Sequence, residues 1–173
     1  ETVQFEKNSF INRNRIRDAS NEFWLTVPVA LKGHLQKRIC EIEISGQAWK
    51  RKHLKSIQQS YQKTAQFTRC NAMISALYTH SHTLLTELLF EHLQFWLTAL
   101  NIDCEVVRSR DLPCTGTKSD LILNICKHLG ADRYLSGVHG RDYLDSEEFS
   151  ADGVEVVDHA FRHPEYDQVH GDF

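Results

Sequence analysis

Two short segments of this 173-residue chain carry side chains that could bind an anion. The first, Asn12-Arg13-Asn14-Arg15, places two guanidinium groups and two amides within four residues. Arginine forks match the geometry of phosphate and carboxylate groups, and an asparagine amide offers both a donor and an acceptor. This composition predicts a ligand-binding segment, and the alternative that the sequence leaves open is a solvated turn between strands.

The second segment, residues 136–142, contains two glycines, a serine, a histidine and an arginine. It follows a strand-like stretch at 133–136 and therefore lies at the carboxyl end of a predicted strand. In open α/β sheets, ligands bind outside the carboxyl ends of strands, where loops expose backbone N–H groups and side chains. We therefore treat this loop as the leading candidate site, with its pocket shaped by Ser136, Gly137, Gly140 and Arg141.

Positive charge is concentrated in the first part of the chain. Residues 1–69 hold 13 Lys or Arg and 6 Asp or Glu, a balance of +7, whereas residues 70–173 hold 7 and 17, a balance of −10. A basic region of this kind suits a phosphorylated ligand. Two more cations could hold a diphosphate: Lys32, beside Gly33, and Lys50, at the start of a predicted helix. Cations there oppose the helix dipole, so a bound anion would explain them, and a merely solvated basic face is the alternative.

The rest of the chain must form the elements that position these segments. Residues 117–129 predict a helix with an apolar stripe, a capping box formed by Thr117 and Asp120, and Gly130 as its C-terminal glycine. Longer helices are predicted over 49–67 and 83–100, and the second is apolar almost all round, as in a buried helix or a subunit contact. Strands are predicted over 23–29, 39–44, 104–108, 133–136 and 154–157.

This order of elements predicts an α/β fold, because strand-like segments alternate with helices after residue 47. We expect three layers, a mostly parallel sheet flanked by helices, with a strand-rich part over residues 3–44. A length of 173 residues fits one domain, so a single α/β domain over 1–173 is expected. The chain starts without a methionine and stops in mid-pattern, and we expect sequence to be missing at both ends.

The five cysteines form no CxxC pair, and Cys40, Cys104 and Cys126 lie in apolar stretches where cysteine acts as a small hydrophobe. This pattern favours a reducing compartment over a disulfide framework. No apolar run is long enough to cross a bilayer, so we expect a cytoplasmic protein. His159 and His163 have the spacing of a zinc helix but lack the glutamate that follows the first histidine, so no metal site is predicted. The sequence does not identify a cofactor.

Several short segments carry a family pattern in order along essentially the whole chain. They are Val3-Gln4-Phe5 with Lys7-Asn8, Asn12-Arg13-Asn14-Arg15-Ile16, Trp24-Leu25-Thr26-Val27-Pro28-Val29, Lys32-Gly33-His34, Trp49-Lys50, Lys118-Ser119-Asp120, Tyr134-Leu135-Ser136-Gly137, and His163-Pro164 with Tyr166, Gln168 and His170-Gly171. They resemble the WbqC-like protein family. The resemblance implies a bacterial cytosolic protein of O-antigen or other surface-polysaccharide biosynthesis, with a suggested role in transferring glycine or another acyl group to a sugar. Members usually carry an upstream strand with a His-Gln-Pro and Pro-Trp-like motif, and a C-terminal extension, and we expect these to be the segments missing from this sequence.

Taken with the resemblance, the residues predict an enzyme that transfers an acyl or aminoacyl group to a nucleotide-linked amino sugar. The expected ligand-binding residues are Asn12, Arg13, Asn14, Arg15, Lys32, Lys50, Lys118 and the four residues of the 136–142 loop named above. A histidine would deprotonate the attacking amine, and the candidates are His34, His163 and His170. The central expectation is that Asn12–Arg15 faces the loop after Tyr134, so that the two wall one basic cavity.

Two other functions remain open on the sequence. One is a non-catalytic accessory protein that binds a nucleotide or phosphate ligand. The other is an aminoacyl transferase that binds tRNA through the basic residues 50–55, although no recognised nucleic-acid-binding motif is present. The sequence leaves the acyl donor, the acceptor sugar and the oligomeric state open.

Overall fold

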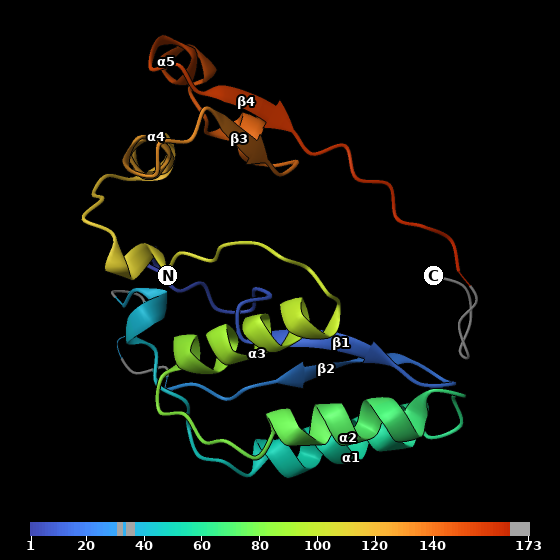
Figure 1. Cartoon of the computed structure of the whole chain (residues 1–173). Helices are drawn as coiled ribbons and strands as arrows, with labels where there is room; N and C mark the ends of the chain where they lie inside the picture. Colours follow the sequence, from blue (N-terminus) through green and yellow to red (C-terminus); the bar gives the residue numbers. More distant parts are fainter. Residues whose placement is uncertain (31–32, 34–36, 167–173) are drawn as a thin grey trace. The chain divides into compact units, whose positions relative to one another are not determined.

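A computed structural model describes residues 1–30, 33 and 37–166, and for Arg141 the backbone alone. The chain forms two compact units, Glu1–Val106 with Glu165–Phe173, and Val107–Pro164. Figure 1 shows the elements of both units, and each unit is described by itself. Both combine helices with a small sheet, so the predicted mixed α/β class is confirmed. A single domain over the whole chain stays a prediction.

The first unit is built on an antiparallel hairpin of β1 (Arg13–Arg17) and β2 (Glu22–Thr26). Asp18 closes its turn, because the carboxylate accepts hydrogen bonds from the backbone N–H of Ser20 at 2.8 Å and of Asn21 at 2.9 Å. This is the local side-chain-to-backbone bonding for which aspartate is favoured in turns. The hairpin places Arg15 opposite Trp24 and so fixes the position of the Asn-Arg segment.

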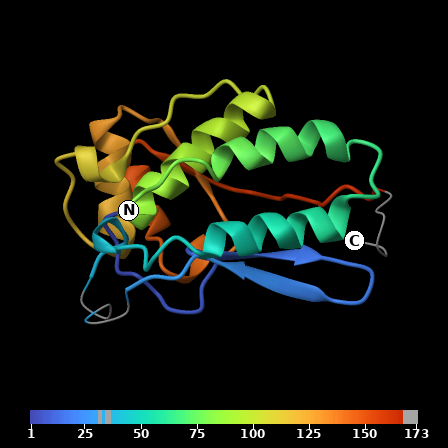
Figure 2. The ribbon, with the colours of Figure 1, turned by 90° about the horizontal axis from the view of Figure 1, so that it is seen from below.

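Three helices and a short 3₁₀ turn complete the first unit. The turn η2 (Ile39–Glu41) precedes α1 (Trp49–Tyr61), α2 (Phe67–Leu77) and α3 (Leu85–Ala99). Helices α1 and α2 form an antiparallel helical hairpin, and α1 runs alongside the β1–β2 strands (Figure 2). Phe5, Ile42 and Leu85 are fully buried together, and they tie the N-terminal segment and the η2 region to the start of α3.

The second unit is a βαβ arrangement with one additional helix. Its elements are η3 (Ser109–Asp111), α4 (Lys118–His128), β3 (Arg133–Ser136), η4 (Gly140–Asp142), α5 (Ser146–Ala151) and β4 (Glu155–Asp158). Strands β3 and β4 are parallel because α5 carries the chain back between them. The core consists of Leu123 and Cys126 from α4, Phe149 from α5, and Val154. The side chain of Asp145 caps α5 by accepting from two backbone N–H groups.

The predicted three-layer arrangement around a mostly parallel sheet is wrong for the described residues, which form two separate two-stranded sheets. Residues 39–44 make the η2 turn and isolated bridges instead of a strand. The cause is local, since the Glu41 carboxylate accepts from the backbone N–H of Arg38 at 2.8 Å and from its guanidinium group at 3.0 Å. Residues 104–108 form no regular element, and Cys104 is exposed where an apolar environment was expected.

Two details of the predicted helices also differ. The helix predicted over 49–67 ends at Tyr61, where both the backbone N–H and the hydroxyl of Thr64 donate to the Tyr61 carbonyl and close a turn before α2. The helix predicted over 117–129 is present as α4, and Gly130 has the expected left-handed φ of 65°. In the described structure, however, the Thr117 side chain makes no capping hydrogen bond, so the capping box is wrong.

Candidate ligand-binding site

A pocket of about 240 Å³ in the first unit brings Asn12, Arg13 and Asn14 together with four ring side chains. The rings come from three helices: Trp49 and His53 from α1, Tyr78 from the end of α2, and His92 from α3. They lie at the open end of the β1–β2 hairpin, where β1 begins and β2 ends. Apolar residues complete the wall, namely Phe10, Ile11, Leu25, Val27, Leu88 and Leu89. A small polar set within a largely apolar wall is typical of ligand sites.

Arg13 is the cation of this pocket. Its guanidinium carbon lies 4.1 Å from the centroid of the Trp24 ring, its Nε donates to the Ser9 carbonyl at 3.2 Å, and its Nη2 donates to the Asn8 carbonyl. These contacts hold the group in place and leave its charge uncompensated. Within the described part of the chain no carboxylate pairs with Arg13, so it can receive an anionic ligand. Asn12 is fixed beside it by donating to the Val27 carbonyl at 2.8 Å.

His53 forms a hydrogen-bonded pair with Tyr78 inside this pocket. A carbonyl oxygen can only accept, so the 3.0 Å contact between His53 Nε2 and the Thr26 carbonyl means that Nε2 carries the proton. The Nδ1 lone pair then faces the Tyr78 hydroxyl at 3.4 Å. Burial lowers the pKa of His53, against the opposing effect of the Thr26 bond, and burial raises the pKa of Tyr78 to about 12. Both groups are therefore uncharged at neutral pH, and Nδ1 is the basic atom.

Two buried polar atoms of the pocket lack hydrogen bonds. The Trp49 side chain is only 6% exposed, and neither its indole Nε1 nor the Nε2 of His92 has a partner among the described residues. The His53 ring lies 4.9 Å from Trp49, and the His92 ring lies 6.0 Å from Tyr78. Buried polar groups are almost always hydrogen-bonded, so these two atoms are positions where a ligand or a water could bind.

Two further cavities share walls with this pocket. Trp49 and His53 also line a cavity of about 490 Å³ that reaches along Ser45–Ala48 to Lys52, and Asn12 and Arg13 also line one of about 240 Å³ beside Phe5 and Lys7. His53 and Arg13 therefore each line two of these three cavities.

Acidic conditions should destabilise the first unit through His53 and His92. Burial lowers the pKa of both, with Glu91 opposing the effect at His92, so below about pH 6.5 the unfolded chain binds protons that the folded unit does not. This contribution to stability is complete above about pH 6.5 and is lost as the pH falls toward the folded pKa values. The expected slope reaches about 1.4 kcal/mol per pH unit for each such proton.

Urea unfolding followed by tryptophan fluorescence measures this slope, because the three tryptophans, Trp24, Trp49 and Trp96, all belong to the first unit. The His53→Gln variant should show a flatter dependence on pH than the unmodified chain. His128→Gln, at an exposed position of α4, is the matched control and should leave the slope unchanged. Identical slopes in all three proteins would contradict a neutral, buried His53.

The other predicted residues of the first unit have different surroundings. Arg15 is paired with Glu22 at 2.7 Å. The Nζ of Lys50 donates to the Ser81 hydroxyl at 3.1 Å and to the His80 carbonyl, so it holds the segment before α3 and does not line the pocket. Lys32, His34 and His170 lie outside the described residues.

The predicted glycine loop belongs to the second unit, where Ser136 and Gly140 are buried and Gly137, Val138 and His139 are exposed. Ser136 is 1% exposed, and its hydroxyl donates to the Gly137 carbonyl at 3.1 Å. A Cβ atom at Gly140 would lie 1.7 Å from Ser136 Oγ, so only glycine permits this approach. Lys118 is exposed at the start of α4, the Arg141 side chain is outside the described atoms, and His163 is exposed beside the Pro164 carbonyl. The cavity expected between this loop and Asn12–Arg15 stays a prediction.

Sequence reasoning missed the ring residues of the pocket. From the sequence, no role is predicted for His53, Tyr78 or His92. One usable signal was present, since Trp49 and His53 are spaced four apart and therefore share a face of α1. The contributions of Tyr78 and His92 depend on tertiary packing alone.

The fold defines a mixed α/β protein, and the Arg13 pocket is its candidate ligand site. The chain belongs to the WbqC-like protein family, whose model matches residues 1–173, so the resemblance seen in the sequence is confirmed. It is 29% identical over 156 residues to a Mycobacterium tuberculosis (strain ATCC 25618 / H37Rv) relative named "Uncharacterized protein Rv1507c", covering 90% of this chain and 68% of the relative. No solved structure matches the chain. None of the helices in the described residues combines the length and apolar character that a bilayer span requires.

Proposed function

We propose that this chain is a transferase of bacterial surface-polysaccharide biosynthesis that moves an acyl or aminoacyl group onto the amine of a nucleotide-linked amino sugar. The observation that carries the proposal is one pocket in which Arg13, free of any described carboxylate, lies near the uncharged His53–Tyr78 pair. An anion site next to a neutral base is what a phosphorylated nucleophile requires. Membership of the WbqC-like family supports the assignment to this class.

Arg13 and Asn12 are the groups suited to the diphosphate. A guanidinium group binds phosphate oxygens bidentately, and the stacking of Arg13 on Trp24 orients it before the ligand arrives. The unpaired indole N–H of Trp49 offers a donor to a sugar hydroxyl or carbonyl oxygen. The neighbouring cavities, of about 490 and 240 Å³, give room for the sugar and for the nucleoside.

His53 and Tyr78 are the groups suited to proton transfer. In the transfer, the amine nitrogen bonds to the carbonyl carbon of an ester or thioester donor, and the bond from that carbon to the leaving oxygen or sulfur breaks. The amine proton passes to the Tyr78 oxygen while the Tyr78 proton moves to Nδ1 of His53, and the resulting imidazolium returns a proton to the leaving group. The Thr26 carbonyl accepts from Nε2 throughout and stabilises the charged ring.

The bases expected from the sequence, His34, His163 and His170, stay predictions, as do the ligand contacts of Lys32, Lys118 and the 136–142 loop. His53 is preferred among the described histidines because it alone combines a buried, deprotonated nitrogen with a tyrosine relay in a pocket that holds an arginine.

A second candidate function is a tRNA-binding aminoacyl transferase. Arg51, Lys52 and Lys55 are exposed on α1, and no carboxylate pairs with them in the described part of the chain. Such a row of cations suits a phosphate backbone. Binding of tRNA that weakens steeply with salt would favour this function, and a lack of binding at low salt would exclude it.

The proposal is tested by thermal unfolding with a panel of nucleotide-linked amino sugars, nucleoside diphosphates and free amino sugars. We expect the nucleotide-linked amino sugars to raise the Tm, and Arg13→Ala to weaken their Kd by about 10- to 100-fold, because a hydrogen-bonded charge is lost. Arg51→Ala removes the same charge outside the pocket and should keep the shift. No Tm shift with any member of the panel would contradict the proposal, and binding without turnover would favour a non-catalytic accessory protein.

A further inference from the structure

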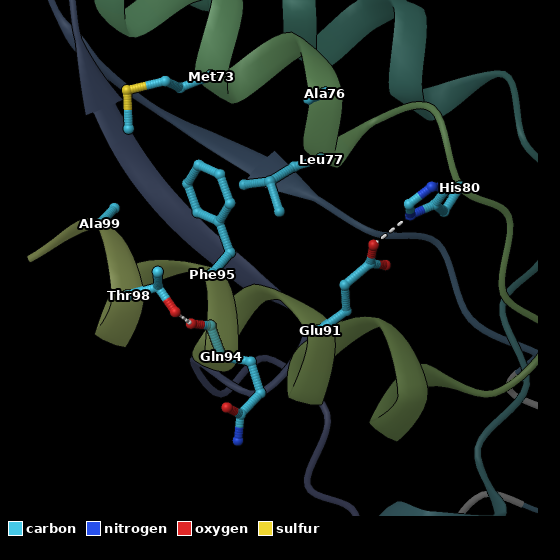
Figure 3. Close-up of a pocket in the computed structure, with 9 residues that line it drawn as sticks. All are labelled: Met73, Ala76, Leu77, His80, Glu91, Gln94, Phe95, Thr98 and Ala99. Carbon is cyan, nitrogen blue, oxygen red and sulfur yellow. Dashed lines mark hydrogen bonds and ion pairs between the residues drawn. The ribbon is translucent and has the colours of Figure 1, made fainter. Parts of the chain in front are cut away.

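A second pocket, of about 480 Å³, lies between α2 and α3 and has mainly apolar walls. Figure 3 shows the side chains of Met73 and Leu77 from α2 and of Phe95 from α3 pointing toward one another across it. Ala76 and Ala99 widen the space because their side chains are short. None of these residues lines the Arg13 pocket, so the two pockets are separate sites in the same unit.

A carboxylate stands at one end of this apolar space. Glu91 accepts hydrogen bonds from Nδ1 of His80 and Nε2 of His82, and the contact with His80 is drawn in Figure 3. Burial acts to raise the pKa of Glu91, but the bonds from the two histidines outweigh it and leave the pKa lowered. The group is therefore ionised at neutral pH. Its side chain is 25% exposed, and no lysine or arginine pairs with it among the described residues.

The two imidazoles orient this carboxylate but do not occupy all of its hydrogen-bond acceptor positions. A carboxylate offers about four lone-pair directions, and the histidines use one on each oxygen. The remaining directions can accept from a ligand that carries several N–H donors on one atom. A primary ammonium group has this property, whereas a ligand carboxylate would be repelled by Glu91.

We propose that the pocket between α2 and α3 binds a primary amine that carries an aliphatic or aromatic body. The ammonium group binds Glu91, and the body packs against Met73, Leu77 and Phe95. The volume falls within the ordinary range for small-molecule sites, and the one polar end fixes the orientation of the ligand. The proposal rests on this pocket alone and does not depend on the transfer reaction proposed for the Arg13 site.

The chain's one methionine makes a direct test available, because Met73 lies in the pocket wall. Protein labelled with methyl-¹³C methionine is titrated with hexylamine, hexanol and hexanoate, and the Met73 methyl resonance is followed. We expect a saturable shift with hexylamine, binding about tenfold weaker for hexanol, and the weakest binding for hexanoate. No shift with hexylamine, or equal affinities for hexylamine and hexanol, would overturn the proposal.

Two variants separate the role of Glu91 from that of the apolar wall. Glu91→Gln should abolish the preference for hexylamine and leave hexanol binding unchanged, whereas Glu105→Gln, the same change at an exposed position of the unit, should keep the preference. Ala76→Phe fills the space and should remove binding of all three compounds. Retention of the amine preference in Glu91→Gln would overturn the assignment. If Glu91→Gln does not fold, the order of the three probes on the unmodified chain decides.

Discussion

Replacing Leu85 with alanine should lower the free energy of unfolding of the first unit by about 3–5 kcal/mol. Leu85 has no exposed surface and packs with Phe5 and Ile42, which come from two other parts of the chain. Its backbone N–H also donates to the Ile42 carbonyl at 2.8 Å, so the surroundings are held and cannot collapse freely into the cavity. A rigid cavity is the condition under which leucine-to-alanine changes cost most.

The matched control is Leu100→Ala, the same chemical change at the other end of the same helix. Leu100 is 63% exposed, and its truncation should change the free energy of unfolding by no more than about 0.5 kcal/mol. Urea unfolding followed by tryptophan fluorescence reports on this unit. Equal losses for the two variants would contradict the placement of the core at the start of α3.

The bounds of single helices and strands are the part of the fold that the sequence predicts best. The helix predicted over 83–100 is α3, Leu85–Ala99, and the strand predicted over 133–136 is β3, Arg133–Ser136. In both segments, local signals agree: apolar periodicity within the element and turn residues at its ends. Gly130 ended the preceding helix as expected because its left-handed φ is a local requirement that glycine meets without strain.

Pairing between distant segments was not predictable in the same way. Residues 39–44 alternate like a strand, yet the local bonds of Glu41 to Arg38 produce a 3₁₀ turn. Residues 104–108 also have strand-like composition but find no paired neighbour among the described residues. Alternation shows that a strand would have two different faces, and it does not show that a partner strand exists. The predicted extended sheet failed for this reason.

The part of the candidate site formed by the Asn-Arg segment could be predicted from the sequence, and the part formed by the helices could not. The donor groups of Asn12–Arg15 predict a ligand-binding segment, and Asn12, Arg13 and Asn14 line the pocket. The ion pair of Arg15 with Glu22 was not predictable from the sequence, because it depends on the hairpin register, which places Glu22 opposite Arg17 on the adjacent strand. The imidazole and phenol groups lie on three different helices, so no spacing in the sequence brings them together.

Replacing His53 with glutamine should lower the kcat of the proposed transfer by about 10²- to 10⁴-fold and leave KM nearly unchanged. The glutamine amide can still donate to the Thr26 carbonyl, so the packing of α1 against β2 is kept. Its other atom, a carbonyl oxygen, cannot take up a proton as Nδ1 of His53 does. The change therefore removes general-base capacity while sparing Arg13, the group that binds the ligand.

Tyr78→Phe gives an independent check, because it removes the hydroxyl that faces Nδ1 and leaves the ring contacts with Trp49 and His92. If the two residues act as one relay, each single change costs nearly as much as both together, since the effects of groups that act as a unit are not additive. Turnover is measured on the nucleotide-linked amino sugar that raises the Tm most, with His128→Gln as the control.

Full kcat in His53→Gln would show that another group accepts the amine proton, and His34, His163 and His170 would then be the candidates to test. Unchanged ligand binding in that variant, measured by Tm shift, would keep the Arg13 pocket as the binding site in either case, because binding depends on the guanidinium group and not on the base.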